Sequence, residues 1–591
     1  MARLRLLHAL LFQISILVIK IDAVPSSLLN SDYQQIQDHC FGNEIDPDRT
    51  AFHFQPSKNW LNDPNGPMYY KGLYHLFYQY NPVGPLWGNI TWGHSVSTDL
   101  VNWEALDLAL DRTDPFDING CWSGSVTFVA GEPVILYTGI DDKQRNVQNI
   151  AFPKNGSDPL LREWVKPSDY NPIMVPGGDI DPDNFRDPST GWFGQDGYWR
   201  TAVGANMKGR AEILLYKSQD FANWTRNEFP LHESLSSGMW ECPDFFPVSL
   251  SSRDGLDPSV NTGNIKHVLK FGLMKTLRDY YLVGTYDEKK DVFIPDEGYE
   301  DDYRTWPVLD YGHIYASKSF FDGKKKRRIL WSWVNESDSE ADDIKKGWSG
   351  IQTFPRAIWL DTNGKQLIQW PIEEIKSLRK QQVQLRDFEL QSGARHEITG
   401  ISTSQANVDV EFELPSLEGA ELFDDSFLLD PSKLCDEITP SDKGGIGPFG
   451  LLVLASDVEG LEEHTGIFFK VYKNSDKYMV LMCSHLRSSS RREGVYKPTF
   501  GAFVGVDISK DKRISLRTLI DHSVVENFAA GGRTCMTLRV YPKHVLTGQT
   551  SGLYVFNLGS LDVNIKELNA WEMARARVNI RNDEFISKDS V

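Results

Sequence analysis

The chain has 591 residues and a formal net charge of -19 at pH 7, from 81 acidic and 62 basic side chains. This excess of negative charge excludes sequence-independent binding of nucleic acid, because phosphate binding needs a cationic face. With 40% hydrophobic and 24% charged residues, the chain can bury a large core, and at roughly 100 to 200 residues per domain it should form more than one domain.

The first 23 residues have the pattern of a secretory signal peptide. Arg3 and Arg5 precede an apolar run over residues 6–19 that is too short to span a bilayer, and Ala23 offers a small residue for cleavage. We therefore expect residues 1–23 to be removed, residues 24–48 to form an N-terminal segment, and the mature protein to be secreted without membrane attachment. Glycosylation sequons are typical of this route, and they begin at Asn89, Asn155, Asn223 and Asn335.

Short β-rich runs recur over residues 49–372. They include GLYHLFY at 72–78 and RILWSW at 328–333, with Gly, Pro, Asn and Asp between the runs, which predicts an all-β fold. The segment from Ser97 to Trp103 returns as Ser218 to Trp224, and both copies begin Ser-x-Asp and end Asn-Trp. The copies start 121 residues apart, which suits two blades of about 60 residues in a five-bladed β-propeller. A chance similarity of two turns is the alternative.

Beyond residue 372 the pattern changes twice. Residues 372–378 (IEEIKSL) space their apolar side chains at helical intervals, which predicts a linking helix that we place at residues 373–388. Residues 406–414 (ANVDVEFEL) alternate apolar and polar side chains, as a strand with one buried face does. We therefore predict a β-sandwich over residues 389–575 and a loose polar tail over residues 576–591.

Three acidic residues lie in loop-like, aromatic surroundings. Asp63 belongs to the turn segment WLNDPNG, Asp187 follows Arg186, and Glu241 lies among apolar residues in WECPDFF. A carboxylate near hydrogen-bond donors or an arginine stays ionised, whereas one surrounded by rings and a thiol keeps its proton longer. One base and one acid are what glycosidic cleavage requires. Each residue alone is better explained as a plain turn or a surface ion pair, but together the three favour a glycosidase.

At these residues the chain resembles glycoside hydrolase family 32, the β-fructofuranosidases, and within it the plant acid invertases and fructan exohydrolases. The matching segments run in family order from about residue 49 to 575. They are NDPNG at 62–66, Gln79, WGN at 87–89, WSGS at 122–125, RDP at 186–188, WECPD at 240–244 and DHSVVENF at 521–528. The resemblance implies a five-bladed β-propeller followed by a β-sandwich, hydrolysis with retention, and no metal or organic cofactor.

The resemblance also implies a role for each matching residue. Asp63 would be the nucleophile, Glu241 the acid/base and Asp187 the transition-state stabiliser, which Arg186 would keep ionised. The residues expected to bind the fructosyl unit are Trp60, Asn62, Gln79, Trp87, Trp122, Ser123 and Arg186, and Trp240 is expected to frame the same sugar site. A disulfide between Cys435 and Cys483 is implied as well, which leaves Cys242 as a buried thiol beside Glu241.

The choice of substrate depends on one loop. Plant cell-wall invertases that resemble this chain carry an Asp, and a Lys three residues later, that help to hold the glucose half of sucrose; here Met274 and Leu277 stand at those positions. A site without these hydrogen bonds should discriminate strongly against sucrose. We therefore expect a fructan exohydrolase that releases terminal fructose from inulin- or levan-type fructans and cleaves little sucrose. A loop shift of one residue would put Lys275 or Arg278 in the place of this clamp, which keeps a cell-wall acid invertase as the alternative.

Two further alternatives rank lower. A non-catalytic fructan- or sucrose-binding protein is disfavoured because all three carboxylates are present, and a fructosyltransferase because it usually shares the missing clamp. We expect fructan or sucrose as the partner, no nucleic acid, and a monomer. Because a charge of -19 should repel the protein from anionic pectin, we expect a soluble enzyme of the apoplast or cell wall, with the vacuole as the alternative.

Overall fold

The computed structural model describes residues 46–438, 444–456, 460–545 and 551–579. The predicted signal peptide, residues 24–45 and residues 580–591 lie outside the described residues. Strands make up most of the regular structure in the described part, as the all-β prediction requires. No helix within these ranges is long and apolar enough to cross a membrane.

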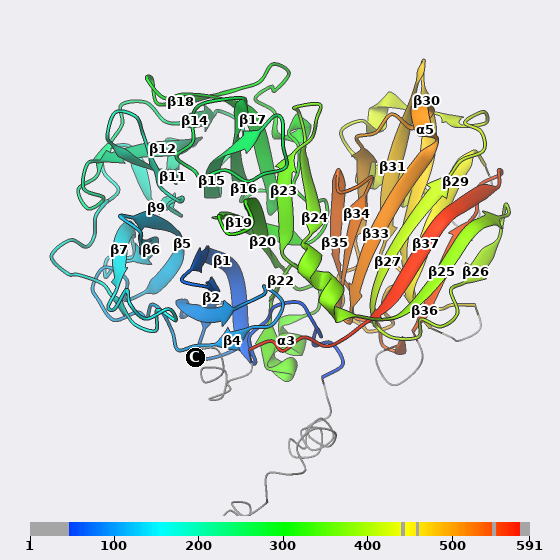
Figure 1. The fold of residues 1–591 in the computed structure, drawn as a ribbon, viewed down its shortest axis with the longest axis horizontal. Coiled ribbons are helices and arrows are strands. Elements are labelled where there is room, and N and C mark those ends of the chain that lie inside the picture. The colour runs from blue at the N-terminus through cyan, green and yellow to red at the C-terminus, as the bar shows by residue number, and fades with distance from the viewer. Residues whose placement is uncertain (1–45, 439–443, 457–459, 546–550, 580–591) are drawn as a thin grey trace, which may run out of the picture. The chain divides into compact units, whose positions relative to one another are not determined.

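Five sheets follow one another along residues 59–371 and are arranged in a ring, the left half of Figure 1. The first contains β21 (Trp348–Ser349), β1 (Asn59–Tyr70), β2 (Leu73–Asn81), β3 (Thr91–Ser97) and β4 (Glu104–Ala105). The second contains β5 (Gly120–Val129), β6 (Glu132–Ile140), β7 (Asn146–Pro153) and β8 (Trp164–Val165). The third contains β9 (Ile180–Arg186), β10 (Trp192–Phe193), β11 (Trp199–Met207), β12 (Arg210–Ser218), β13 (Thr225–Arg226) and β14 (His232–Ser234).

The last two sheets of the ring have the same antiparallel order. The fourth contains β15 (Trp240–Ser249), β16 (Ile265–Leu273), β17 (Arg278–Asp287) and β18 (Val292–Pro295). The fifth contains β19 (Ile314–Asp322), β20 (Arg327–Val334), β22 (Ile351–Gln352), β23 (Arg356–Leu360) and β24 (Leu367–Pro371). β21 follows β20 along the chain but pairs in parallel with β1, so it ties the last sheet to the first. The five-bladed β-propeller is therefore confirmed.

The repeated segment forms the same turn in the first and third blades, after β3 and after β12. In each copy the Asp carboxylate, Asp99 or Asp220, accepts the backbone N–H groups of the second and third residues after it, at 2.7–3.0 Å. The side-chain amide of Asn102 or Asn223 donates to the same carboxylate, at 2.8 and 2.7 Å. The two copies are thus equivalent parts of two blades and not a chance similarity.

Two sheets of a β-sandwich follow the propeller (Figure 1). One contains β25 (Arg379–Leu390), β37 (Val563–Met573), β27 (Gln405–Glu413), β33 (Arg513–Asp521), β34 (Val524–Ala529) and β35 (Thr534–Arg539). The other contains β26 (Arg395–Glu397), β36 (Gly552–Asn557), β29 (Ile446–Ala455), β30 (Thr465–Asn474), β31 (Lys477–His485) and β32 (Thr499–Val504), with β28 (Glu421–Leu422) beside β30. The short helices among the described residues are α3 (Glu340–Lys346), α4 (Pro431–Glu437), α5 (Ile508–Asp511), η1 (Tyr303–Thr305), η2 (Glu373–Leu378) and η3 (Asp425–Phe427).

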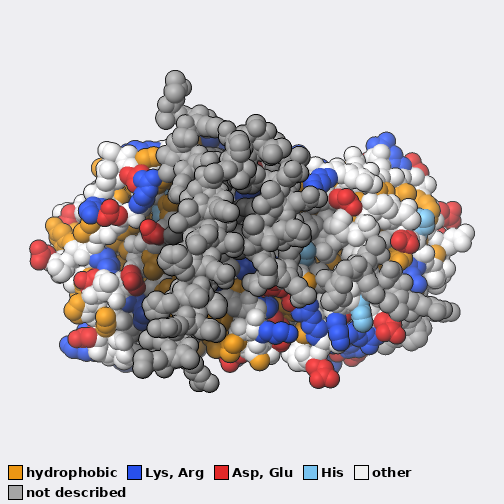
Figure 2. Space-filling view, turned by 90° about the horizontal axis from the view of Figure 1, so that it is seen from below, with side chains coloured by type: hydrophobic (Ala, Val, Ile, Leu, Met, Phe, Trp, Pro, Cys, Tyr) orange, Lys and Arg blue, Asp and Glu red, His pale blue; other side chains and the backbone are white. Residues whose placement is uncertain are grey.

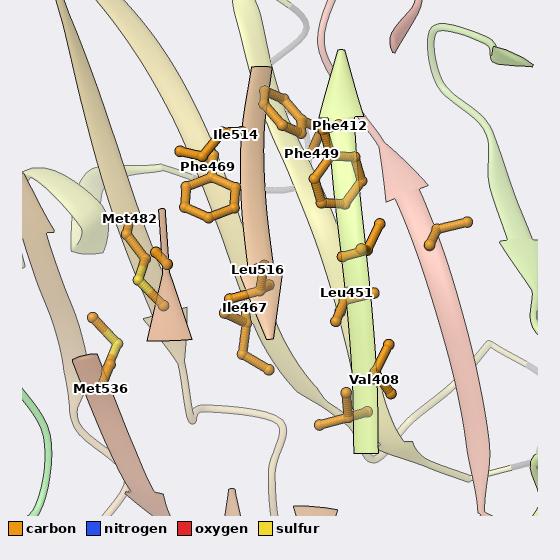
Figure 3. Close-up of a cluster of buried hydrophobic side chains, with 14 of the residues drawn as sticks. Val408, Phe412, Phe449, Leu451, Ile467, Phe469, Met482, Ile514, Leu516 and Met536 are labelled. Carbon is orange, nitrogen blue, oxygen red and sulfur yellow. The ribbon is translucent and has the colours of Figure 1, made fainter. Parts of the chain in front are cut away.

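The core of the sandwich lies between its two sheets. Figure 3 shows Val408 and Phe412 of β27 close to Phe449 and Leu451 of β29, and all four side chains are buried. This is the face that the alternation in residues 406–414 predicted to be apolar. Outside this core, a disulfide joins Cys435 of α4 to Cys483 of β31, which confirms the expected pairing.

The predicted linking helix is wrong for most of its length. The helical turn η2 covers only Glu373–Leu378, and the chain continues as the strand β25 from Arg379. Beyond Leu378 the less exposed apolar residues Val383 and Leu385 are two positions apart, and they pack on the sandwich core. Pairing with β37 along this stretch therefore gives the period of a strand and not of a helix.

The prediction of a loose tail is wrong for residues 576–579. Asn579 is buried, accepts a hydrogen bond from Ser95 Oγ at 2.8 Å and donates its amide to the Gln55 carbonyl at 2.5 Å. Val578 forms a bridge with Trp103 of the first blade. The chain therefore returns from the last sandwich strand to the propeller, where blade residues supply partners for its polar groups.

The DHSVVENF motif of the sandwich binds the start of the propeller through buried charges. Asp521 accepts backbone N–H groups of residues 51–53 at 2.6–2.9 Å, and His53 Nδ1 lies 2.8 Å from its Oδ2. His53 Nε2 lies 2.8 Å from Glu526 Oε1, and Arg356 of β23 forms an ion pair with Glu526. Burial alone would lower the pKa of His53, but Asp521 and Glu526 outweigh it and raise the pKa to about 9.

Candidate active site

Bulges in the innermost strands bring the candidate residues together. The pairing register shifts at a similar place in four of them: Leu61/Pro64 in β1, Cys121/Gly124 in β5, Glu241/Asp244 in β15 and Tyr315/Lys318 in β19. A bulge bends the strand and re-aims its side chains. Asp187, directly after β9, and Cys242, within the β15 bulge, have positive φ angles of 69° and 47°. This left-handed backbone turns their polar groups toward the residues of neighbouring blades.

Asp63 lies at the centre of a hydrogen-bond network. Its Oδ1 accepts from Asn62 Nδ2 at 3.0 Å, and its Oδ2 accepts from Ser123 Oγ at 2.5 Å. Gln79 links the two donors, because it accepts from Asn62 at 2.8 Å and donates to Ser123. Trp60 Nε1 donates to Asn62 Oδ1 at 2.8 Å. Five residues predicted to act on the sugar are thus joined in one network.

Asp187 lies beside Asp63 and is connected to it by Cys242. The Cys242 N–H donates to Asp187 Oδ2 at 2.9 Å. Its Sγ lies 3.5 Å from Asp63 Oδ2 and 3.6 Å from Asp187 Oδ2. The predicted buried thiol is therefore confirmed, and it lies between the two aspartates.

Glu241 is held by side chains from two other blades. Arg186 Nε and Nη2 each lie 2.9 Å from Glu241 Oε1, and the Tyr315 hydroxyl donates to Oε2. Arg186 Nη2 also lies 3.5 Å from the sulfur of Met274. The Glu241 side chain keeps 18% exposure, so a substrate can approach it.

The charge environment differs from the sequence prediction. Burial raises the pKa of Asp63 well above its usual range; the Ser123 hydrogen bond lowers it, and the charges of Asp187 and Glu241 raise it. Burial also raises the pKa of Asp187, and Arg186 only partly offsets this. The charge of Arg186 acts on Asp187 in the expected direction, but the direct ion pair of the guanidinium is with Glu241. Adjacency in sequence does not determine which carboxylate the guanidinium contacts; Asp187 itself has a left-handed backbone, φ 69°.

The predicted tryptophans fall into two groups. Trp60 joins the Asp63 network, and Trp87, which is 58% exposed, meets Trp122 edge to face with ring centroids 5.9 Å apart. Trp240 is completely buried and stacks on Phe271 at 4.0 Å between centroids, so the expectation that it frames the sugar site is wrong. Its ring points into the blade, on the opposite side of β15 from the neighbouring Glu241.

The loop after β16 carries two exposed apolar side chains, and one of them, Met274, is linked to Glu241 through Arg186. Met274, which contacts Arg186, is 51% exposed, and Leu277 is 52% exposed. Lys275 Nζ lies 5.1 Å from the ring centroid of Tyr303. Arg278 lines a cavity that Trp306 and Leu428 also bound. Lys275 and Arg278, the proposed substitutes for the clamp, therefore lie in surroundings that differ from those of Met274.

Tyr315 is the residue of this site that the sequence did not reveal. It comes from β19, and no motif or charged neighbour marks it. Its position depends on the β19 bulge, which brings the hydroxyl to Glu241 across the blade boundary. A register shift of this kind has no signal in a single sequence.

The remaining predicted sites lie away from this centre. Of the sequon asparagines, Asn89, Asn155 and Asn223 are exposed and Asn335 is half-buried. Within the described residues, one acidic trio has the spacing of metal ligands: Glu336, Asp338 and Asp343. The Lys346 ammonium lies 2.5–3.4 Å from all three carboxylates, and Arg539 pairs with Glu336, so cationic side chains already occupy the cluster, which favours a structural role.

Comparison with known protein families gives two matches that cover most of the chain. "Glycosyl hydrolases family 32 N-terminal domain" matches residues 53–371, and "Glycosyl hydrolases family 32 C terminal" matches residues 374–572. The boundary between them coincides with the passage from the propeller to the sandwich.

Similar proteins come from grasses and from chicory. "Beta-fructofuranosidase, insoluble isoenzyme 7" of Oryza sativa subsp. japonica is 60% identical over 539 residues, 90% of each chain. "Fructan 6-exohydrolase" of Triticum aestivum is 55% identical over 549 residues, 90% of this chain and 91% of that one. The crystal structure of fructan 1-exohydrolase IIa from Cichorium intybus is 50% identical, with a TM-score of 0.88 over 91% of this chain and 100% of that one.

Proposed function

Because the chain belongs to glycosyl hydrolase family 32, we propose that it is a fructan exohydrolase that releases terminal fructose from β-fructans. The observation that carries the proposal is the convergence of Asp63, Asp187 and Glu241 in one site of the propeller. Arg186 contacts both Glu241 and Met274, and so links Met274 to this site. The relatives named as fructan exohydrolases in wheat and chicory support it.

In the proposed reaction Asp63 attacks the anomeric carbon of the fructosyl unit and forms a covalent ester. Glu241 gives its proton to the departing oxygen, then takes a proton from the water that breaks the ester. Asp187 holds fructosyl hydroxyls and stabilises positive charge that develops in the ring. Asn62, Gln79 and Ser123 form hydrogen bonds with the fructosyl hydroxyls. The rings of Trp60, Trp87 and Trp122 form the walls of the site. Arg186 orients Glu241.

The substrate proposal rests on the apolar side chains at Met274 and Leu277. A hydroxyl-rich glucose unit would find no hydrogen-bond partner in their side chains, which disfavours sucrose. The competing proposal, a cell-wall acid invertase, is supported by the 60% identity to the rice β-fructofuranosidase.

One assay separates these functions. The secreted protein is incubated separately with sucrose, inulin and levan at pH 5, and free glucose and fructose are measured. Fructose from a fructan with little glucose from sucrose supports the exohydrolase, whereas rapid glucose release from sucrose supports the invertase. Failure to release any sugar would exclude catalysis. Glu241→Gln should abolish turnover while the thermal unfolding curve stays unchanged.

A second assay tests the basis of specificity. The double variant Met274→Asp/Leu277→Lys should raise sucrose cleavage relative to levan cleavage at least tenfold, since it supplies polar partners for glucose. Phe229→Asp, a change of another exposed apolar residue, is the matched control and should leave the ratio unchanged. An unaltered ratio in the double variant would reject this explanation of specificity.

For localisation we propose a secreted monomer of the apoplast that is not tightly bound to the wall, with the vacuole as the competing compartment. Acidic and basic side chains are interspersed on the visible part of the face in Figure 2, within a total charge of -19. Such a surface should bind anionic pectin weakly. Extraction of tissue with low-salt and then high-salt buffer should recover the protein in the first fraction. Size-exclusion chromatography should give the mass of one chain, which is 67.2 kDa less the removed signal peptide, plus any glycans.

A further inference from the structure

Two buried lysines lie directly behind the bulge that carries Glu241 and Cys242. Lys270 of β16 and Lys318 of β19 are each 1% exposed. Lysine is rarely buried to this degree, because removing an ammonium from water is costly unless polar partners replace the water. Their partners therefore indicate what they do.

Both ammonium groups bind backbone carbonyls of the bulge. Lys270 Nζ donates to the Cys242 carbonyl at 2.7 Å and to the Ser317 carbonyl in the β19 bulge. Lys318 Nζ donates to the Pro243 carbonyl at 3.3 Å. A regular antiparallel ladder would satisfy such carbonyls by cross-strand N–H groups, but the register shift between Glu241 and Asp244 removes that pairing. The lysines supply the missing donors.

The bulge in turn sets the position of the reactive groups. Cys242 has a left-handed backbone, φ 47°, and its N–H and Sγ face Asp187. A non-glycine residue in this conformation costs free energy and persists only where surrounding contacts fix it. The carbonyl bound by Lys270 belongs to the same residue. A change at Lys270 would thus reach both Asp187 and the adjacent Glu241.

Lys318 also adds positive charge behind a group of carboxylates. Its charge acts on Asp187, in the direction that favours the ionised form. The charged or titratable groups that act on Asp187 or on Lys318 are Arg186, Glu241, Cys242, Asp244 and Lys270. Asp187 in turn acts on the neighbouring nucleophile, Asp63. The charge of Arg186 acts on Asp187 in the same direction, and Lys318 is joined to the bulge itself by its hydrogen bond to the Pro243 carbonyl.

We propose that Lys270 and Lys318 are positioning residues for the glycosidase reaction: Lys270 holds the left-handed bulge that aims Cys242 and Glu241, and Lys318 holds the next carbonyl of the same bulge, that of Pro243. This inference rests on the proposed roles of Asp63, Asp187 and Glu241, and it is independent of which fructoside is preferred.

The test uses Lys270→Met, Lys318→Met and Lys318→Gln in the full-length enzyme, with the best of sucrose, 1-kestose and levan as substrate. Lys270→Met should lower kcat about 100-fold with little change in KM, as expected for a displacement of the acid/base by about 1 Å. Lys318→Met should also lower kcat with little change in KM, by a smaller factor because its hydrogen bond to the Pro243 carbonyl is the longer one, 3.3 Å. Lys318→Gln keeps a donor for the Pro243 carbonyl, so it should retain more of kcat than Lys318→Met does.

The matched control is Lys470→Met, which removes a buried lysine of the sandwich that pairs with Glu421 at 2.9 Å. It should lower Tm without changing kcat or the pH profile. If the propeller variants behave like this control, with a lower Tm but an unchanged pH profile and kcat, the lysines only stabilise the fold and the inference is wrong. Asp187→Asn is measured in parallel: an active Asp187→Asn enzyme would reject the proposed role of Asp187 itself, a failure distinct from that of the lysines.

Discussion

Asp63 has neighbours that shift its pKa in opposite directions. Burial and the charges of Asp187 and Glu241 raise it, whereas the Ser123 and Asn62 donors lower it. A nucleophile must be ionised to attack, so these donors set the lowest pH at which the enzyme can work. The hydroxyl of Ser123, 2.5 Å from Oδ2, is the nearer of the two donors.

Ser123→Ala should therefore move the acid limb of the kcat/KM profile to higher pH. Removal of the donor leaves burial and repulsion unopposed at Oδ2, which raises the pKa of Asp63 further. The profile is measured between pH 3.5 and 8 on the preferred fructoside. Ser125→Ala is the control, since Ser125 lies on the same strand and bonds the Pro188 carbonyl instead. An acid limb that stays in place would show that Ser123 does not control Asp63.

The blade is the element in which local and long-range constraints meet. Its outer turns are specified locally, as the twin segments after β3 and β12 show: the same Ser, Asp, Asn and Trp produce the same hydrogen bonds and the same positive φ, 65° at Leu100 and 64° at Phe221. Its inner strand is specified by its neighbours, because bulges there leave carbonyls and side chains to be bound by other blades, as Lys318 and Tyr315 of β19 bind Pro243 and Glu241 of β15.

Asp99→Ala and Asp220→Ala should each destabilise the protein by about 1 kcal/mol, comparable to the loss of a helix cap. Each carboxylate satisfies two backbone N–H groups and an amide that would otherwise lack a partner. The backbone N–H of Asn223 and its side chain lower the pKa of Asp220, so this contribution is present above the usual aspartate range and is lost as the pH falls. Urea unfolding at pH 7 and pH 3 measures the loss of stability and its pH dependence, with Thr98→Ala as the control. If Asp220→Ala destabilised the protein equally at both pH values, the predicted pH dependence would be wrong.

At the scale of the whole molecule, the propeller and the sandwich share one set of buried charges. His53, from the segment before β1, lies between Asp521 and Glu526 of the sandwich, and Arg356 of the fifth blade completes the group with Asp310. All five side chains are buried, so each charge depends on its partners. The motif at residues 521–528 is therefore a structural connection between the propeller and the sandwich.

His53→Phe should destabilise the folded protein by about 3–5 kcal/mol at pH 5 to 6, because it leaves two buried carboxylates short of a cation. The folded pKa of about 9 lies above the ordinary histidine value, so the contribution is complete below about pH 6.5 and disappears as the pH rises through about 9. Unfolding of the wild type and the variant is compared at pH 5, 7 and 10. His396→Ala, at a partly exposed histidine of β26, serves as the control. A difference that persists unchanged at pH 10 would show that His53 is not held as a cation.

The sequence by itself determined the features whose causes lie close together in the chain. The alternation in residues 406–414 predicted a half-buried strand, the repeated segment predicted equivalent blades, and the aromatic and polar surroundings of Asp63, Asp187 and Glu241 indicated a carboxylate site. The resemblance at those residues implied the family and the Cys435–Cys483 disulfide, and both are confirmed. The catalytic roles of the carboxylates stay predictions for the assays above.

Only the tertiary structure decided which partners these residues have. Arg186 pairs with Glu241, 55 residues away, and not with the adjacent Asp187; Tyr315 reaches Glu241 from another blade; Trp240 faces the core although it neighbours Glu241. The strand β25 replaces a predicted helix because it pairs with β37, which comes more than 170 residues later. The physical reason is common to these cases: the register of a strand and its bulges determine which way a side chain points, and strands distant in the sequence fix that register.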